Sequence, residues 1–226
     1  MQTLNYKTPA GEEHLKKALD FCKNGIAGAE MYTFLRLEGN SIPEGRFFCA
    51  ENEQGETVSA VFLNGDLTVT KQEGVSPYPG LCVMAYRGAP PPEDPALTPA
   101  GLRETLAFYR AQGEGTLTAA NEARYVYRAR ALRDGLALGF CVKEDGAPVS
   151  FAYITAQNKN AALIGDVFTL PPYRGRGYAR RNVLACAREA VVSGKKAYIV
   201  CKEETAGFYL RMGFERMRNS ECGMRN

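Results

Sequence analysis

The sequence predicts an α/β protein that is built from two related units. First, helical and strand patterns alternate along the chain, and in the second half one strand runs through a glycine loop directly into a helix. Second, a hairpin pattern occurs twice: Phe48-Cys49, Gly55 and Val58–Phe62 correspond to Phe140-Cys141, Gly146 and Val149–Tyr153. About five of these positions are identical, so a chance similarity between two half-buried hairpins is the alternative.

In the first half, turn and cap residues divide the chain into two helices and a hairpin. Thr8 and Pro9 suit the N-cap and the first position of a helix, and Gly25 suits its C-terminal stop. A second helix is predicted over 27–37, followed by hairpin strands over 46–52 and 56–64. A further strand over 81–86 leads into a proline-rich loop, 88–95, whose prolines fit neither a helix interior nor a central strand.

A boundary between the two units is predicted at Gly113-Glu114-Gly115, which ends a helix over 99–112. The units are therefore 1–115 and 116–226. The elements predicted after the boundary are a helix over 117–133, strands over 135–143, 147–156 and 161–169, a helix over 178–193, a strand over 196–201, a helix over 205–212 and a last strand from Phe214. This order gives a sheet in which one strand feeds into a loop and then a helix.

Bulk properties argue against several classes of function. A formal charge of +3, with acids and bases interspersed, does not favour nucleic acid or an anionic membrane as the main partner. The chain has no basic leader with an apolar core and no run near the roughly 18 apolar residues of a membrane helix, so a cytoplasmic location is expected. His14 is the single histidine and no cysteine pair has zinc spacing, which argues against a metal centre and against catalysis by a serine–histidine or cysteine–histidine pair. A homodimer is left open.

The segment from Arg174 to Gly177 has the chemistry of a diphosphate-binding loop. Pro171-Pro172 ends the preceding strand, and the helix that follows offers unpaired N–H groups and a partial positive charge to an anion. Gly175 and Gly177 allow a close approach and positive φ angles. Four arginines add positive charge: Arg174, Arg176, Arg180 and Arg181. On these residues alone, a tight strand-to-helix connection with solvated arginines is the alternative.

These residues resemble the GNAT superfamily, the acetyl-CoA-dependent N-acetyltransferases. Arg174-x-x-Gly177-x-Ala179 is similar to the family's pyrophosphate signature, and Val167–Tyr173 looks like its fourth strand and connecting turn. Phe208-Tyr209-x-x-x-Gly213-Phe214 is similar to the family segment in which a tyrosine stands near the thiol of CoA. The two signatures occur in the family's order, and the resemblance covers roughly the last 110 residues. It implies two GNAT-like units, each a mixed, mostly antiparallel sheet flanked by helices.

The resemblance also assigns roles to individual residues. Acetyl-CoA would be the co-substrate, and no metal is implied. Val167, Phe168 and Thr169 would hold the pantetheine arm, because a splayed strand end leaves backbone groups free to pair with its amides. Contacts to the pyrophosphate would come from the loop and the first helical turn: Arg174, Gly175, Arg176, Gly177, Tyr178, Ala179 and Arg180. Tyr209 would protonate the departing thiolate, or at least donate a hydrogen bond to it.

Some positions depart from the family pattern or are left open by it. Lys202 stands where many members have an asparagine that contacts CoA. No motif fixes the general base; Asp166 is a candidate, and a water chain is the alternative because attack of a free amine on a thioester mainly needs positioning. In the first unit, Arg87–Pro92 follows the strand over 81–86, and its prolines lack N–H donors for a phosphate. That degenerate unit is expected to bind no CoA and to wall the substrate cleft.

The predicted activity is transfer of an acetyl group from acetyl-CoA to an amine by direct attack in a ternary complex. A non-catalytic protein that senses CoA or acyl-CoA is the alternative. The acceptor is expected to be a small-molecule or peptide amine. Its identity is not predicted, because the acidic residues that could hold it are scattered along the chain: Glu30, Glu44, Glu51, Glu73, Glu144 and Asp166.

Overall fold

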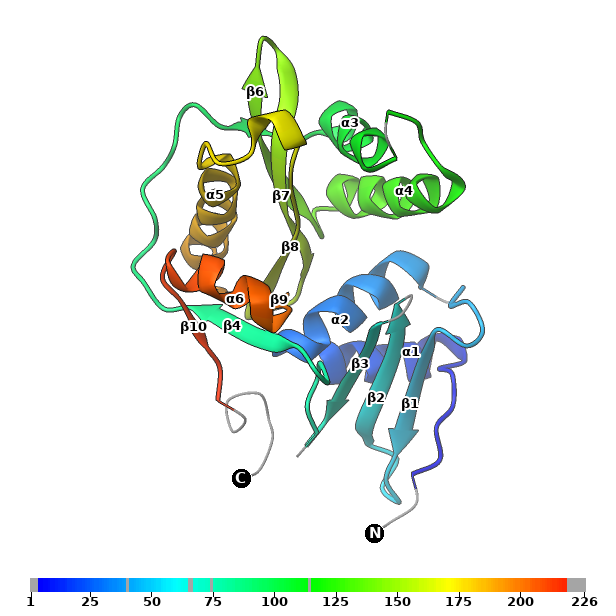
Figure 1. Ribbon diagram of the computed structural model, residues 1–226. Coiled ribbons are helices and arrows are strands. Elements are labelled where there is room, and N and C mark those ends of the chain that lie inside the picture. Colours follow the sequence, from blue (N-terminus) through cyan, green and yellow to red (C-terminus); the bar gives the residue numbers. More distant parts are fainter. Residues whose placement is uncertain (1–3, 40, 65–66, 74, 114, 219–226) are drawn as a thin grey trace.

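The computed structural model describes residues 4–39, 41–64, 67–73, 75–113 and 115–218. Within these residues the chain forms a mixed α/β fold with two sheets flanked by helices (Figure 1). One sheet has three strands in the order β1-β2-β3, and the other has seven in the order β10-β4-β9-β8-β7-β6-β5. The predicted fold class is confirmed.

The smaller sheet belongs to the first half of the chain and is antiparallel throughout. Its elements are α1 (Gly11–Cys22), α2 (Ile26–Glu38), β1 (Phe47–Glu51), β2 (Thr57–Asn64) and β3 (Leu67–Gln72). The predicted helix start at Thr8 is wrong, because α1 begins at Gly11 after the N-cap Ala10. Backbone hydrogen bonds of 2.9 Å in both directions between Lys7 and Cys49 hold the preceding segment extended against β1.

The larger sheet is mixed, because β8 and β9 are parallel and the other neighbours are antiparallel. Its strands are β4 (Cys82–Tyr86), β5 (Thr98–Pro99), β6 (Leu138–Glu144), β7 (Ala147–Gln157), β8 (Ala161–Thr169), β9 (Lys196–Cys201) and β10 (Phe214–Arg216). Its helices are α3 (Leu102–Gln112), α4 (Ala119–Arg133), α5 (Tyr178–Val192) and α6 (Glu203–Leu210). The predicted bounds of β8 and β9 agree with the structure.

Strand β4 comes from the first half of the chain but lies between β9 and β10 of the larger sheet. The sequence interpretation of this strand as the fourth of the first unit, with a proline-blocked phosphate loop after it, is therefore wrong. Residues 87–97 instead link β4 to β5 across the outside of α5 (Figure 1). Because β4, β5 and α3 precede residue 115, the predicted division at that residue does not coincide with the division between the sheets.

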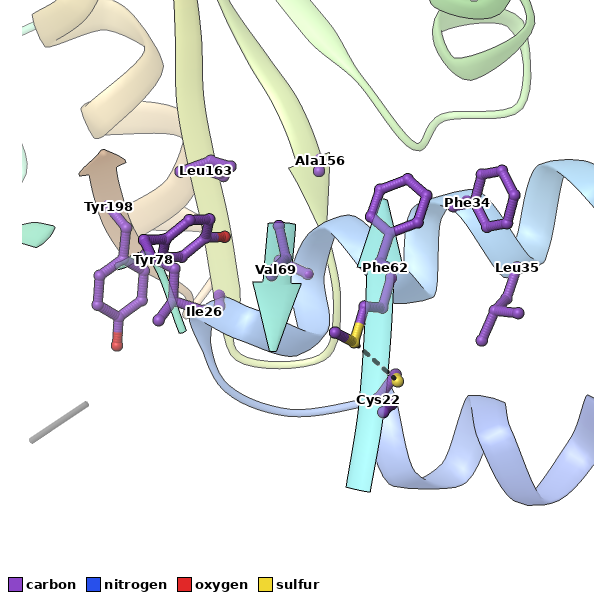
Figure 2. Packing of buried hydrophobic residues seen from close by; sticks show 14 of the residues in the cluster. Cys22, Ile26, Phe34, Leu35, Phe62, Val69, Tyr78, Ala156, Leu163 and Tyr198 are labelled. Atoms are coloured by element: carbon purple, nitrogen blue, oxygen red, sulfur yellow. Dashed lines mark hydrogen bonds between the residues drawn. The ribbon is translucent and has the colours of Figure 1, made fainter. Parts of the chain in front are cut away.

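One hydrophobic core joins the two halves. Phe34 of α2 and Phe62 of β2 pack with their ring centroids 4.6 Å apart. The same cluster contains Ala156 and Leu163 from β7 and β8, as well as Tyr198 from β9 (Figure 2). Because these buried side chains come from both sheets, the first half is fixed against the underside of β7, β8 and β9.

Strand β8 is buried between the first half and its own following helix. Ala162 and Ile164 pack in the cluster that contains α5, whereas Ala161 and Leu163 pack in the cluster that contains α2. This alternation follows from the two-residue period of a strand. The face covered by α5 and the face covered by α2 are therefore separated only by the thickness of β8 and β9.

Candidate active site

The centre of the candidate site is the point at which β8 and β9 part. The two strands pair in parallel from Ala161↔Lys196 to Ile164↔Ile199, and no pairing follows although both strands continue. Within β8 the register against β7 shifts, and Asp166 has a φ of 49°. Such a bulge bends the strand, so the backbone of Val167–Thr169 has an open edge on its β9 side. The splayed strand end that the resemblance implies is present.

A two-glycine loop connects β8 to α5 through one 3-10 turn, η1 (Pro171–Tyr173). Gly175 has a φ of 78°, and Gly177 is the N-cap of α5 in the left-handed conformation, with φ 79° and ψ 2°. A Cβ atom at either glycine would meet nothing within 4 Å. The glycines are therefore required by backbone conformation rather than by packing, and the space beside the loop is open.

The start of α5 fits the pyrophosphate of CoA. No side chain caps this helix, so the N–H groups of its first turn are not satisfied by a capping residue. The helix dipole adds a partial positive charge at the same place. Tyr178 and Ala179 are half-buried and Arg180 is exposed, so this end of the helix is accessible. Together with the open space at both glycines, these features make an anion site of the correct kind.

Three exposed arginines surround this loop and bond to backbone carbonyls. Arg174 Nε donates to Thr169 O at 3.1 Å, and Arg180 Nη1 donates to Arg211 O at 2.9 Å. The guanidinium of Arg176 lies 5.2 Å from the ring centroid of Tyr173. Arg181 differs, because its guanidinium makes a two-point ion pair with Asp94 at 2.7 and 3.1 Å. The expectation that Arg181 adds charge for phosphates is therefore not supported; it holds the 87–97 link onto α5.

A buried polar network fixes the loop to the sheet. Asn182, which is fully buried, donates from Nδ2 to Ser150 Oγ at 3.0 Å, and that hydroxyl lies 2.8 Å from Thr169 Oγ1. The Tyr178 hydroxyl also donates to the Glu144 carboxylate. Both ends of the loop are thereby tied to the β6–β7 hairpin, which supplies the rigid support that a preorganised anion site needs.

Tyr209, the proposed acid, lies on the α5 side of the sheet. Its ring packs against Phe208 and Phe214, with centroid distances of 5.1 and 6.1 Å. Burial, with a smaller contribution from Cys201, raises the pKa of Tyr209 to about 12. The phenol therefore keeps its proton at neutral pH, and among the described residues its hydroxyl makes no hydrogen bond. A phenol with so high a pKa is better suited to donate a hydrogen bond to a ligand than to transfer its proton fully.

Asp166, the candidate base, lies on the opposite side and is held by a buried arginine. Arg128 of α4 reaches it from Nη2 at 3.0 Å, and its Nη1 donates to the carbonyl of Thr155. The Tyr109 hydroxyl is a more distant donor to Asp166, at 3.4 Å. Burial alone would lower the pKa of Arg128, but the nearby Asp166 carboxylate and Tyr109 raise it above its ordinary value. Arg128 is therefore a fixed positive charge beneath the β8 bulge.

A cavity of about 270 Å³ lies at this bulge, on the side of the sheet opposite Tyr209. The second half lines it with Leu163, Gly165 and Asp166 of β8, Val200 of β9, and Tyr127 and Arg128 of α4. The first half lines it with Glu30, Phe62, Leu67 and Leu81. The first half thus forms one wall of the cavity at the strand opening.

Two faces of the sheet meet at this opening. Ile199 and Cys201 of β9 belong to the cluster on which Tyr209 packs, whereas Val200 between them lines the cavity. Because successive strand residues point to opposite faces, Tyr209 and Asp166 stand on either side of the gap between β8 and β9. The sequence did not indicate this arrangement.

Several residues of the cavity were missed by the sequence interpretation. Arg128 was not singled out, although it lies seven residues after the buried Asn121 and three before the buried Ala131. This spacing places it on the inner face of a helix, and that was an available signal. Glu30 was counted among scattered acids, and nothing in the sequence indicated that Phe62, Leu67 and Leu81 would meet it.

A splayed strand, a two-glycine loop and an uncapped helix start together form a site that suits an extended, amide-bearing arm with a pyrophosphate at its end. Residues 104–214 match the model of the acetyltransferase (GNAT) family, so the chain carries an acetyltransferase domain of that family. Members of this family use acetyl-CoA. A search of curated proteins gave no match.

Solved structures show the same fold over nearly the whole chain. A tandem GNAT protein from the clavulanic acid biosynthesis pathway is 13% identical, with 95% of each chain covered and a TM-score of 0.57. A GCN5-related N-acetyltransferase from Kribbella flavida is 16% identical, with 88% of this chain and 91% of that chain covered and a TM-score of 0.53. Among the described residues no helix is long and apolar enough to cross a membrane.

Proposed function

We propose that this protein is an N-acetyltransferase that transfers an acetyl group from acetyl-CoA to an amine by direct attack in a ternary complex. The observation that carries the proposal is the continuous path from the open edge of β8, through the two positive-φ glycines, to the uncapped start of α5. These features meet the separate needs of an amide-bearing arm and a pyrophosphate.

The residues that would hold the co-substrate lie along this path. Val167, Phe168 and Thr169 would pair with the pantetheine arm through the backbone edge that β9 leaves open. The pyrophosphate would be held by the loop and the first turn of α5, from Gly175 to Arg180, with Arg174 beside it. Acetyl-CoA supplies the acetyl group as a thioester, which a free amine can attack without covalent help from the protein.

The two faces of the sheet would have different roles, with the acceptor bound on one face and the leaving thiolate assisted on the other. The acceptor would enter from the cavity beside Asp166, and its nitrogen would bond to the acyl carbon through the gap between β8 and β9. The proton that the amine loses would pass to Asp166 or to a water chain. On the other face, Tyr209 would donate to the sulfur as the carbon–sulfur bond breaks. One proton is lost by the amine and one is gained by the sulfur, so the exchange balances.

Two measurements test this function. Calorimetry with CoA tests the cradle, and micromolar affinity is expected at physiological salt. A panel of amines with acetyl-CoA and colorimetric detection of released thiol then tests turnover. CoA binding without thiol release from any amine would favour a CoA sensor, and absence of CoA binding would refute both functions.

A further inference from the structure

The cavity beside Asp166 is polar where it is exposed and apolar where it is buried. Asp166, whose side chain is 32% exposed, accepts a hydrogen bond from Arg128, which also donates to the carbonyl of Thr155. These three lining residues form one polar side, which solvent reaches at Asp166. The lining also contains Phe62 and Leu163, which are 3% and 5% exposed. The cavity therefore runs from an accessible polar side to a buried apolar side.

The first half of the chain supplies an apolar wall to this cavity, formed by Phe62, Leu67 and Leu81. Leu67 and Leu81 are half-buried and, like Val200 of β9, pack against the core cluster that contains Phe62. None of these side chains has a hydrogen-bonding group, so a ligand hydroxyl, amide or carboxylate would lose water here without gaining a partner. A hydrocarbon chain has no such cost, and each methylene that it buries improves affinity about fourfold. The wall therefore favours a hydrocarbon chain.

The position of the thioester decides which substrate carries this chain. In the proposed complex the CoA arm follows the open edge of β8, and its sulfur lies on the face of Tyr209. On that face Phe208 and Phe214 pack against Tyr209. An acyl chain longer than acetyl therefore leaves the strand gap on the opposite face, where Val200 lines the cavity. The acceptor amine is not tethered there and can approach from the solvent-exposed side at Asp166.

We propose that the site also accepts short linear acyl-CoA donors longer than acetyl-CoA, with the acyl chain packed against the apolar wall. This rests on the proposed acyl transfer and keeps its balance: the acceptor nitrogen bonds to the acyl carbon, the carbon–sulfur bond breaks, and the amine loses one proton while the sulfur gains one. The cavity volume of about 270 Å³ lies below the range of roughly 300–1,000 Å³ that is typical of pockets for drug-sized ligands. A short chain fits this space, and a long fatty acyl chain does not.

The first experiment is calorimetry with a series of CoA thioesters, which needs no acceptor. CoA, acetyl-CoA, butanoyl-CoA, hexanoyl-CoA and succinyl-CoA are titrated into the full chain. Butanoyl-CoA has two more methylenes than acetyl-CoA and is expected to bind about tenfold more tightly. Succinyl-CoA carries a carboxylate in place of the terminal methyl of butanoyl-CoA and is expected to show none of this gain. Equal affinities for acetyl-CoA and butanoyl-CoA, or tighter binding of succinyl-CoA than of butanoyl-CoA, would overturn the inference.

The second experiment removes part of the apolar wall. Leu81→Ala is expected to lower the ratio of hexanoyl-CoA affinity to acetyl-CoA affinity about fivefold, while the affinity for CoA itself stays within about twofold. The retained CoA affinity shows that the variant is folded, and Leu67→Ala replaces it if it is not. Leu19→Ala is the matched control, because Leu19 packs against the same core cluster and is not among the residues that line the cavity. A ratio that is unchanged in both wall variants would contradict the inference.

Turnover tests whether the bound thioester is a donor. With an amine that releases thiol from acetyl-CoA, KM for hexanoyl-CoA should be at least about tenfold lower and kcat within about threefold, because the chain contacts are the same in the ground and transition states. Hexanoyl-CoA that inhibits acetyl transfer without being consumed would overturn the donor role. Absence of CoA binding would refute the proposed function together with this inference, whereas CoA and acetyl-CoA binding without any gain from a longer chain would overturn this inference alone.

Discussion

Strands β3 and β8 are the third strands of two related helix–helix–hairpin–strand units, and they differ in what they allow. β3 pairs with β2 in a continuous register over six residues, and the next strand along the chain is β4. β8 has two register shifts, a left-handed Asp166, and a following glycine loop and helix. The features of the proposed cofactor site therefore come from the irregular strand and the appended helix, and not from the shared unit. The regular copy forms a wall instead.

The placement of β4, a strand of the first half, in the larger sheet leads to the prediction with the largest expected effect. β4 lies between β9 and β10 and pairs with both. A fragment of residues 116–226 therefore lacks the strand that joins β9 to β10, and it also lacks α3 and β5. We expect this fragment to show no cooperative unfolding transition, whereas a fragment of residues 79–226 regains one. Circular dichroism with urea checks this. Cooperative unfolding of the 116–226 fragment would show that the predicted boundary at residue 115 is a true domain boundary.

The next prediction concerns Arg128, which pairs with Asp166 at the bulge of β8. The regular strand β3 has no corresponding pair. Arg128→Met removes one member of a buried ion pair whose side-chain exposures are 8% for Arg128 and 32% for Asp166. We expect a loss of about 3 kcal/mol in the free energy of unfolding, because Asp166 and the Thr155 carbonyl lose their buried partner. Urea denaturation measures it. Arg124→Met, an exposed residue of the same helix, is the control and should change stability by less than about 0.5 kcal/mol.

The glycine that starts α5 tests the difference at the cofactor loop. Gly177→Glu places a carboxylate where the pyrophosphate is proposed to bind and is expected to weaken CoA binding about 100-fold in calorimetry. Gly194→Glu is the matched control, because Gly194 follows the other end of the same helix, has a φ of 73° and also has open space around a Cβ atom. Both variants carry the same backbone strain. Equal loss of affinity in both would mean that the loop is not the cradle.

Tyr209→Phe tests the chemistry on the α5 face. We expect kcat to fall about tenfold, with CoA affinity within about twofold, because a hydrogen-bond donor to the sulfur is lost. Since the pKa of Tyr209 is about 12, the phenol donates throughout pH 7–10, and the ratio of wild-type to variant rates should be constant over this range. Tyr86→Phe is the control: its ring also contacts Phe214, and its hydroxyl donates to Ala89 O. An unchanged kcat in Tyr209→Phe would exclude the role.

Residues that end or start secondary-structure elements explain what could be predicted from the sequence. Pro171-Pro172 and Gly177 stop one element and start the next by backbone geometry, so β8, the loop and α5 were placed almost to the residue. Local sequence does not determine which sheet β4 joins, because an apolar run such as Cys82–Tyr86 suits the centre of either sheet. The cavity could not be predicted for the same reason: Glu30 and Asp166 line the same cavity only because of tertiary packing. The loop, whose residues are contiguous in the sequence, could be predicted. The cavity, whose residues come from both halves of the chain, could not.

The smallest expected effect concerns the 87–97 link, which ties β4 from the first half to α5 of the second. Asp94→Asn removes its two-point pair with Arg181, in which the side chains are 30% and 32% exposed, so a loss of at most about 1 kcal/mol is expected. The hydrogen bonds from Arg181, opposed by partial burial and aided by the Ala96 N–H, lower the pKa of Asp94 below its ordinary value of 3.8. A lowered folded-state pKa gives stability that is present above pH 3.8 and lost as the pH falls through the folded value.

The difference in Tm between wild type and Asp94→Asn should therefore be constant from pH 7 to about pH 5 and shrink as the pH falls below 3.8. Differential scanning calorimetry over this range checks it. Glu93→Gln serves as the control, because Glu93 is 77% exposed and lies 3.5 Å from Arg188 in a single-point pair, for which a smaller difference is expected. A difference for Asp94→Asn that grows toward pH 3 would show that the link is held by something other than this ion pair, and that β4 joins the larger sheet through its strand pairing alone.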